Sequence, residues 1–519
     1  MILKEINKIE VEAKNNSSND ALKIISLSNM EVYIYPKSIN TYNELTFFIG
    51  RVNYEKVLFI VTNYTNSNLL KNYEGKILEL ENKDIVVKQC PQNHSNALQL
   101  QEYFTYTKPI LLGLSNSFGF GDRIGLANHA HIRSLVGSDF RPILAQQSIR
   151  ELTRTKRTPE QVMDVAIWAV FQEGYKGGFG SDADHLKTTE DIDLMINAGF
   201  TMFTFDPNEY VINEADSIDI PALETKAEKI NWNSLDDTFP NMLKRYTGVE
   251  FDLKEGLIIK PSYEDILRAT VKYGNAIGHL RTLYNYLKTE YSYLPYEVEI
   301  SVDETESVTT PFEHFFIASE LNRLGVKIVS LAPRFIGDFE KGIDYKGDLE
   351  IFKTEYLKHV KIAEYFGSYK ISLHSGSDKF GVYKTIGSLK RGFTHVKTAG
   401  TSYLEALKVV AFAEPTEFRK ILDFARIEYE KEKNSYHVSA DLKNVFASDK
   451  YSDEQLLELF TQNDARQVLH VTFGTVLTID DENGKYIFRD IIYNCLKKNE
   501  DVHYNYLINH FRNHLNPFK

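Results

Sequence analysis

Short apolar runs recur along the middle of the chain. Most are followed by a loop rich in Gly, Asp, Ser and His and then by a stretch with helical periodicity. This alternation is typical of parallel sheets in which helices connect successive strands. Eight such units can close into a TIM-type (β/α)8 barrel, with an open doubly wound sheet as the alternative. The runs are Ile110–Leu114, Pro142–Ala145, Gly177–Phe179, Thr201–Phe205, Glu297–Val302, Lys327–Leu331, Lys370–Leu373 and His395–Lys397.

Three segments differ in pattern from this repeat. Residues 1–108 are rich in Asn and Lys and carry short strand-like runs, which predicts a small N-terminal α/β subdomain. Residues 213–295 interrupt the repeat as an insertion that ends in a long helical stretch, Tyr263–Thr289. Beyond the eighth run the pattern becomes mostly helical. We therefore expect a catalytic barrel over 109–440 and a helical C-terminal extension over 441–519.

The composition excludes several kinds of partner. With 60 Lys and Arg against 72 Asp and Glu, the net charge is −12, whereas nucleic-acid-binding proteins normally carry a basic field. No apolar stretch reaches the roughly 18 residues of a membrane span, and the N-terminus lacks a secretion signal, so we expect a cytoplasmic location. Two cysteines are too few for a disulfide scaffold. These features predict a soluble enzyme for a small molecule, and a homo-oligomer is compatible with them.

Polar side chains follow many of the apolar runs, and the active sites of TIM barrels lie at the carboxyl ends of strands. His185 comes after two aspartates in a Gly-rich loop, and His374 directly follows an apolar run. Imidazole and carboxylate together suit a divalent metal, although a single histidine is more often a structural residue. Asp184 and Glu304 are our candidates for acid–base chemistry. Other candidates at this edge are Asp206, Asp303, Arg334, Ser375, Asp378, His395 and Lys397.

Three basic residues are candidates for holding a substrate carboxylate. They are Arg123, Arg334 and Lys397, each placed close to the end of an apolar run. Cationic side chains at such positions suit carboxylate recognition. For Arg334 and Lys397 the alternative is a salt bridge to the acidic residues of the site itself.

The Gly-rich segment 113–125 resembles a dinucleotide-binding loop only superficially. The third glycine of GxGxxG is missing, because Ile124 stands there, and Asp122 would face a pyrophosphate. We therefore expect Gly121, Asp122 and Arg123 to form a substrate loop. The alternative is a tight turn with an Asp–Arg pair.

Several long motifs occur in order through most of the chain. They are GFGDR at 119–123, ILAQQSIRE at 143–151, FQEGYKGGFGSDADH at 171–185, GFTMFTFDP at 199–207, SVDETE at 301–306, RFIGDFEKGIDYKGDL at 334–349, KISLHSGSDKFGVY at 370–383 and HVKTAGTSYLEA at 395–406. Together these motifs resemble those of the tagaturonate epimerase family, UxaE, over roughly residues 109–440.

The resemblance implies a metal-dependent enzyme that interconverts D-tagaturonate and D-fructuronate by epimerisation at C4 in bacterial hexuronate catabolism. It further implies that Asp184 accepts a proton and Glu304 donates one. His185, His374 and His395 are the metal ligands it suggests, for a divalent ion such as Zn, Ni, Mn, Fe or Co. A ketohexose 4-epimerase, an aldolase or a ketose isomerase on a related sugar is the alternative.

The position of C4 restricts the mechanism. C4 is β to the ketone of a 2-keto hexuronate, so simple enolisation cannot invert it. Transient oxidation at C4 would need a bound nicotinamide, and the sequence has no convincing dinucleotide fingerprint. Retro-aldol cleavage of the C3–C4 bond, with a divalent ion stabilising the enediolate, is therefore the mechanism we favour.

Overall fold

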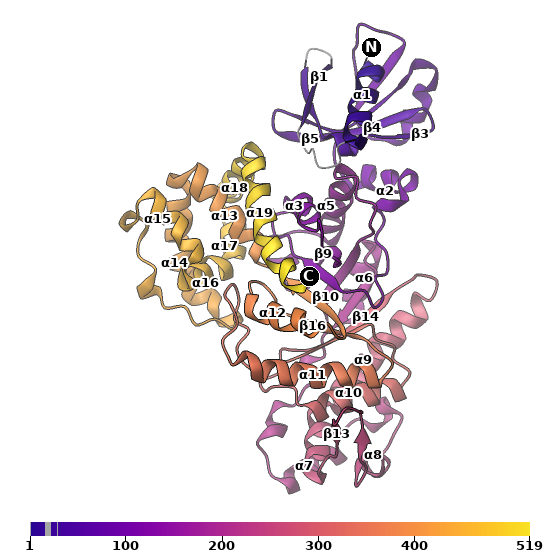
Figure 1. The fold of residues 1–519 in the computed structure, drawn as a ribbon, viewed down its shortest axis with the longest axis vertical. Coiled ribbons are helices and arrows are strands. Elements are labelled where there is room, and N and C mark those ends of the chain that lie inside the picture. The colour runs from indigo at the N-terminus through magenta and orange to yellow at the C-terminus, as the bar shows by residue number, and fades with distance from the viewer. Residues whose placement is uncertain (1, 16–21, 28–29) are drawn as a thin grey trace.

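The centre of the molecule is a closed barrel of eight parallel strands (Figure 1). The computed structural model describes residues 2–15, 22–27 and 30–519. Strand neighbours follow the order β10-β11-β14-β15-β16-β17-β8-β9, and the last strand in sequence pairs with the first. The expected TIM-type barrel is thereby confirmed. The strands are β8 (Ser117–Phe120), β9 (Arg141–Ser148), β10 (Gly180–Leu186), β11 (Met202–Phe205), β14 (Glu297–Val302), β15 (Ser330–Pro333), β16 (Lys370–Leu373) and β17 (Phe393–Thr398).

Two barrel strands lie elsewhere than the apolar pattern predicts. The first strand is β8 and not Ile110–Leu114, a segment whose first two side chains are exposed. The third strand, β10, begins after the run Gly177–Phe179. The inward positions of β10 include Asp182 and Asp184, so apolar content does not reveal it. Asp184 and His185 consequently lie on the strand itself and not in a loop after it.

Most helices around the barrel begin at a side-chain cap. Thr158 and Gln161 form a capping box at α5 (Pro159–Gln172), and Thr310 forms one with Glu313 at α10 (Pro311–Arg323). These side chains satisfy backbone N–H groups that have no partner within the helix. The remaining helices of the barrel are α3 (Asn128–Ser134), α4 (Ile149–Thr155), α6 (Thr189–Asn197), α11 (Leu349–Tyr365) and α12 (Phe380–Leu389).

A helical insertion separates β11 from β14 at one end of the molecule (Figure 1). Its small core joins Leu223, Leu267 and Val271, so the insertion packs on its own long helix. The elements are α7 (Ile220–Glu228), α8 (Phe239–Tyr246), the two-stranded pair β12 (Phe251–Asp252) and β13 (Ile258–Ile259), and α9 (Tyr263–Glu290).

An antiparallel sheet forms the N-terminal part, at the opposite end of the molecule (Figure 1). Its strand order is β1-β2-β4-β5-β7-β6, with β3 paired to β4. Ile6 and Ile9 of α1 (Ile2–Asn15) join the apolar cluster on this sheet. The strands are β1 (Lys23–Leu27), β2 (Met30–Ile34), β3 (Asn40–Tyr42), β4 (Leu45–Val52), β5 (Glu55–Asn63), β6 (Lys76–Leu78) and β7 (Ile85–Cys90), and α2 (His94–Tyr103) leads on to the barrel.

The chain after β17 is helical and has an apolar core of its own, to which Tyr403, Phe418 and Ile492 belong. The last helix returns to pack against α3 of the barrel. No helix in the described ranges is long and apolar enough to cross a membrane. The helices are α13 (Thr401–Ala413), α14 (Pro415–Glu432), α15 (Asp453–Glu458), α16 (Asn463–Val471), α17 (Phe473–Thr478), α18 (Arg489–Lys498) and α19 (Glu500–Leu515).

Candidate active site

Two adjoining cavities open at the carboxyl ends of the barrel strands. The inner cavity, of about 50 Å³, is lined by Asp184, His185 and Lys397 among others. The outer cavity, of about 460 Å³, is lined by Arg334 and by side chains that the two cavities share, such as His374. This is the edge at which TIM-barrel enzymes carry their active sites.

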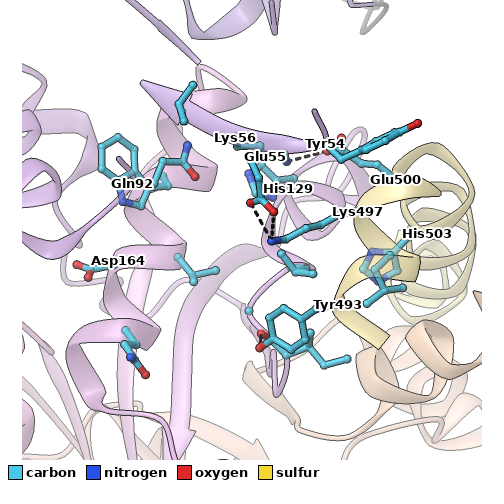
Figure 2. A pocket seen from close by; sticks show the side chains of 18 of the residues that line it. Tyr54, Glu55, Lys56, Gln92, His129, Asp164, Tyr493, Lys497, Glu500 and His503 are labelled. Atoms are coloured by element: carbon cyan, nitrogen blue, oxygen red, sulfur yellow. Dashed lines mark hydrogen bonds and ion pairs between the residues drawn. The ribbon is translucent and has the colours of Figure 1, made fainter. Parts of the chain in front are cut away.

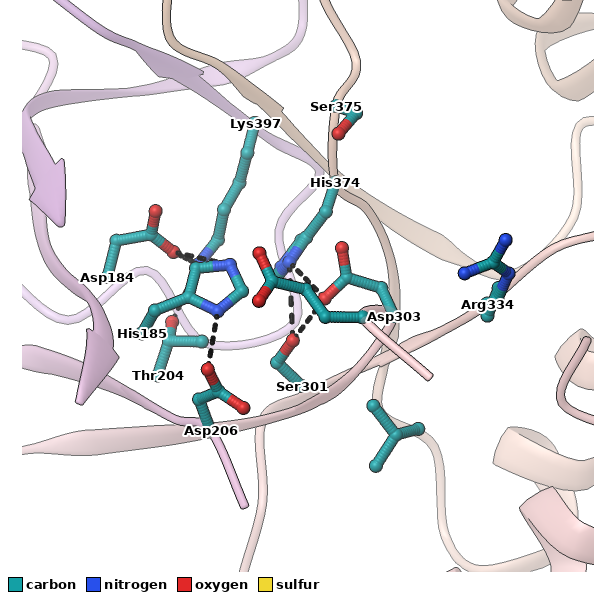
Figure 3. A network of polar contacts seen from close by, with 12 residues as sticks. Asp184, His185, Thr204, Asp206, Ser301, Asp303, Arg334, His374, Ser375 and Lys397 are labelled. Atoms are coloured by element: carbon teal, nitrogen blue, oxygen red, sulfur yellow. Dashed lines mark hydrogen bonds and ion pairs between the residues drawn. The ribbon is translucent and has the colours of Figure 1, made fainter. Parts of the chain in front are cut away.

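Lys397 of β17 lies at the centre of a buried polar network (Figure 3). Its ammonium is 2.7 Å from Asp182 Oδ2, 2.7 Å from Asp184 Oδ1 and 2.8 Å from Glu299 Oε1. It also donates to Thr204 Oγ1 at 2.6 Å. Burial would lower the pKa of Lys397, but the three carboxylates raise it well above its usual value. The ammonium is therefore the counter-ion of the site's own acids, which is the alternative that the sequence left open for this residue.

His185 reaches the site through an irregularity in β10. The pairing of β10 with β11 shifts register between Ala183 and Leu186, and His185 has a φ of 53°. A bulge of this kind re-aims a side chain that regular alternation would point to the other face of the strand. The imidazole lies 3.4 Å from Asp206 Oδ2 and 3.8 Å from Asp184 Oδ1.

His374, just after β16, faces His185, with ring centroids 5.1 Å apart (Figure 3). Its Nε2 lies 2.7 Å from Glu299 Oε1, and its Nδ1 lies 3.1 Å from Asp303 Oδ1. One possible ligand atom each of His185, Asp303 and His374 lies within 4.8 Å of the others. A second such group joins His185 to Asp206 and Glu304. Two imidazoles and a carboxylate are a donor set that suits Zn and related divalent ions.

The electrostatics of these groups favour a cation. Burial would lower the pKa of His185, but the carboxylate of Asp184, with Asp206 and Asp303, raises it to about 10. Asp303 likewise raises the pKa of His374 to about 9, against the opposing effect of burial. Both imidazoles are thus protonated at neutral pH unless another cation offsets this negative charge. The residues present therefore fit a divalent metal ion.

The two candidate acid–base residues line the same inner cavity but differ in environment. Asp184 is half-buried, and its carboxylate is held by Lys397. Burial would raise the pKa of Asp184, but the charges of Lys397 and His185 hold it below its usual range. Glu304 lies beyond the end of β14, with 36% of its side chain exposed, and its nearest cation is Arg150 at 3.4 Å. Asp184 is therefore ionised, while Glu304 contacts solvent.

Known proteins of one family are similar to this chain over nearly its whole length. A family model described as tagaturonate epimerase matches residues 35–518. The chain belongs to this family, UxaE. It is 40% identical to the tagaturonate/fructuronate epimerase of Thermotoga maritima over 486 residues, which is 93% of this chain and 96% of the relative.

Solved structures of the same family share the fold. The native crystal structure of the fructuronate-tagaturonate epimerase UxaE from Cohnella laeviribosi has a TM-score of 0.86 and 35% identity, covering 98% of this chain and 99% of that one. A glycerol complex of that protein has a TM-score of 0.86 and 36% identity, covering 94% of this chain and 96% of that one. The resemblance read from the motifs is thus confirmed.

The residues that the sequence predicted as a substrate loop, Gly121, Asp122 and Arg123, mostly make contacts within the fold. The Asp122 carboxylate accepts backbone N–H groups of Gly125 at 2.6 Å and Ala127 at 2.7 Å, and it lines neither cavity. Gly121 lines neither cavity and donates its N–H to a backbone oxygen of β17 at 2.8 Å. Arg123 lines the inner cavity but pairs with Glu151 at 2.9 Å and not with Asp122. The structure therefore places Gly121 and Asp122 in a turn beside the site.

Two further residues that the sequence predicted for the site, His395 and Asp378, lie apart from His185 and His374. His395, two residues before Lys397 on β17, lies 3.0 Å from Ser117 Oγ and belongs to none of the candidate ligand groups among the described residues. Burial lowers its pKa. Asp378, predicted to bind substrate, forms an ion pair with Arg466 at 2.7 Å and lines neither cavity. The last two predicted site residues, Arg334 and Ser375, line the outer cavity. Arg334 donates to the Thr305 backbone oxygen, and the Ser375 hydroxyl accepts a hydrogen bond from Lys341 at 2.7 Å.

Sequence reasoning missed three residues that line both cavities, namely Arg150, Lys341 and Tyr436. Arg150 lies two residues beyond the end of β9, so the strand-end rule could have found it. Lys341 lies in the long segment after β15, and Tyr436 follows α14. Lys341 stands inside the motif at 334–349, which could have marked it, whereas Tyr436 lies outside every quoted motif and follows no strand.

Proposed function

We propose that this chain interconverts D-tagaturonate and D-fructuronate by inverting C4, with a divalent metal ion and retro-aldol chemistry. The observation that carries the proposal is the group of His185, Asp303 and His374 at the strand ends, next to Asp184 and Lys397. The 40% identity to a relative named tagaturonate/fructuronate epimerase supports the substrate.

The proposed metal ligands are His185 and His374 through their imidazole nitrogens and Asp303 through a carboxylate oxygen. A bound divalent ion supplies Lewis acidity, which stabilises negative charge that develops on substrate oxygens. Glu299 accepts a hydrogen bond from His374 Nε2 at 2.7 Å, which fixes the orientation of the ring. The other ring nitrogen, Nδ1, lies on the side of Asp303 and is the one that would bind the metal.

The acid–base steps use Asp184 and Glu304. Asp184, kept ionised by Lys397, accepts the proton of the C4 hydroxyl. The C3–C4 bond then breaks: its electron pair forms the C2–C3 double bond of an enediolate, the C2 carbonyl oxygen takes the negative charge, and C4 becomes an aldehyde carbon. After the aldehyde turns, the bond re-forms on its other face and Glu304 returns a proton to O4. The two residues exchange duties in the reverse direction.

The function is tested by incubating the purified protein with D-tagaturonate and one divalent ion at a time, and resolving the epimers by NMR. We expect D-fructuronate to form with some ions and not after chelation. In D₂O the product should carry no deuterium at C4, because that hydrogen stays on carbon, and a ¹³C isotope effect should appear at C3 and C4 if cleavage limits the rate. Deuterium at C4 would contradict the retro-aldol route, and accumulated cleavage fragments would indicate an aldolase.

Replacing one proposed metal-binding residue and measuring the bound metal tests the site independently of activity. His374→Ala should lose most of its bound metal by elemental analysis and lose activity, while circular dichroism stays unchanged. His94→Ala is the matched control, because His94 is a surface residue paired with Asp164. Full activity of the metal-stripped wild-type protein would disprove the proposed metal dependence.

The acid–base assignment predicts a loss in kcat at constant metal content. Asp184→Asn and Glu304→Gln should each lower kcat by roughly 10²–10⁴, the usual size of a general acid–base contribution. Asp219→Asn serves as control, because Asp219 caps α7 in the remote insertion. If Glu304→Gln keeps the wild-type kcat in both directions, Glu304 is not the donor.

A further inference from the structure

The basic residues around the two cavities differ in how far their charge is neutralised. Lys397 contacts three carboxylates, and Arg123 pairs with a buried glutamate. Arg334 lines only the outer cavity and donates to a backbone oxygen. Among the lysines and arginines of the described residues, only Arg150 and Lys341 line both cavities.

Lys341 carries a charge without an acidic contact. Its ammonium donates to Ser375 Oγ at 2.7 Å and forms no ion pair with a carboxylate of the described residues. Burial and the nearby guanidinium of Arg150 lower the pKa of Lys341, and the carboxylates of Glu304, Asp303 and Glu151 offset this only in part, so some positive charge is left uncompensated. An anion bound in the cavity would remove this deficit.

Arg150 has N–H groups that donate to no described residue. Its one ion pair in the described structure, to Glu304 Oε1, is 3.4 Å long, whereas charge-assisted hydrogen bonds are usually about 2.7–2.9 Å. The side chain is 41% exposed, and its guanidinium lies 5.7 Å from the centre of the Tyr436 ring. Its one side-chain hydrogen bond uses a single nitrogen, so other N–H groups of the guanidinium have no acceptor among the described residues, and Arg150 lines both cavities.

We propose that Arg150 and Lys341 together bind the carboxylate of the substrate, and that they select sugar acids over neutral ketohexoses. This assignment rests on the proposed function and replaces the three clamps expected from the sequence. A guanidinium binds a carboxylate through two parallel hydrogen bonds, and an ammonium adds a second charge.

The chemistry of the substrate agrees with this location. The carboxylate carbon of a hexuronate, C6, is two bonds from C4, so its binding group must lie close to the residues that move protons at O4. Arg150 is next to Glu304, and Lys341 contacts Ser375, which follows His374 in the chain. A carboxylate held there leaves the ketone end free to reach the proposed metal ligands.

The kinetic test compares Arg150→Met and Lys341→Met with the wild-type holoenzyme. Each variant should raise KM for D-fructuronate roughly 10- to 100-fold, the effect of losing one hydrogen bond to a charged group, while kcat changes much less. For Lys341→Met the kcat/KM for the neutral ketohexose D-tagatose should stay within about threefold, whereas Arg150→Met also removes the ion pair with Glu304 and is therefore compared by ligand binding. Lys341→Arg, which keeps the charge, should recover most of the affinity. Lys358→Met is the control, because Lys358 pairs with Glu355 on the outer helix α11.

A binding measurement separates this inference from the proposed function. Isothermal calorimetry would compare D-galactonate, a six-carbon acid, with galactitol, its uncharged counterpart. We expect the wild type to prefer the acid and both Met variants to lose that preference. If the wild type fails to epimerise uronates but still prefers the acid, the proposed function is wrong and the anion site stands.

Two results would overturn the assignment. The first is an unchanged KM for fructuronate and an unchanged galactonate affinity in both Met variants. The second is an equal loss of galactonate and galactitol binding in variants with native circular dichroism, since the side chains would then shape the cavity without recognising charge. If a Met variant does not fold, Lys341→Gln and Arg150→Gln replace it in the same comparisons.

Discussion

The Lys397 ammonium has a structural role that its position at a strand end does not reveal. It lies within 2.8 Å of oxygens from Asp182, Asp184 and Glu299, and all four side chains are largely withdrawn from solvent. Buried charges are tolerated only when they are paired and hydrogen-bonded. Lys397 therefore supplies the counter-charge for the acids next to the proposed metal ligands, and it lowers the pKa of Asp184 and Glu299.

Removing this ammonium should be costly for folding as well as for activity. Lys397→Met should lower the free energy of unfolding by roughly 3–5 kcal/mol, because it leaves uncompensated buried carboxylates. It should also raise the pKa of Asp184, which should move the acid limb of the pH–rate profile to higher pH. Urea denaturation followed by tryptophan fluorescence measures the first effect, with Lys358→Met as control. A Met variant as stable as wild type at pH 7 would show that these carboxylates take up protons without penalty.

Strand β10 shows why part of the site could not be predicted from the sequence. Its inward face is polar, so the apolar run that marks most barrel strands is missing and the strand begins later than expected. The positive φ of His185 reverses its side chain, which alternation along a strand does not anticipate. The residue types were still recognisable, since Asp184 and His185 stand together in a conspicuous DADH motif.

Other elements were predictable, and the contrast has a physical reason. Glu297–Val302 and Lys370–Leu373 have the predicted bounds, because apolar residues alternate with polar ones along both and the apolar ones belong to the main core. Lys341 and Tyr436 come from segments nearly 100 residues apart, and only tertiary structure brings them to one cavity. Local patterns thus predicted most of the strands and the two histidines, but not the network of acids around Lys397 or the two cations that line both cavities.

Gly121, at the end of β8, is required by strand packing. An added Cβ would lie 2.4 Å from the Thr398 backbone oxygen and 2.7 Å from Ala399 Cα, and backbone of the neighbouring strand cannot move away cheaply. We expect Gly121→Ala to destabilise the protein by about 1–3 kcal/mol, as overpacking does, in urea denaturation. Gly381→Ala in α12 is the control, because its Cβ would meet only the Leu349 side chain, at 3.1 Å. Equal stability of the two variants would contradict this interpretation of the GFG motif.

Glu500, a buried acid, links the N-terminal sheet to the C-terminal helices. Glu500, the first residue of α19, accepts from the Tyr35 hydroxyl at 2.6 Å and from Arg51 at 2.8 Å, and it lies 2.7 Å from the Lys56 ammonium. These partners belong to the N-terminal sheet or to the segment just after β2. Figure 2 shows Lys56 and Glu500 at a cavity of about 570 Å³ between the sheet, the barrel and α18–α19. The acid therefore fastens the N-terminal sheet to the C-terminal helices.

This junction predicts a specific dependence of stability on pH. Burial would raise the pKa of Glu500, but Lys56 and Tyr35 lower it below its usual value. A lowered folded-state pKa contributes stability that is fully present above the unfolded-state value, about 4.3, and is lost as the pH falls towards the folded-state value. Glu500→Gln should therefore cost roughly 2–5 kcal/mol at pH 7, where it leaves Lys56 without its counter-ion, and less near pH 4.

Urea denaturation at both pH values, monitored by fluorescence and by proteolysis of the N-terminal sheet, measures this difference. Glu482→Gln, in an exposed turn, should shift neither profile. Parallel pH profiles of the wild type and Glu500→Gln would mean that Glu500 is not ionised in the folded protein. The ion pair of Glu55 with Lys497 at 2.7 Å would then remain as a polar contact between the sheet and α18.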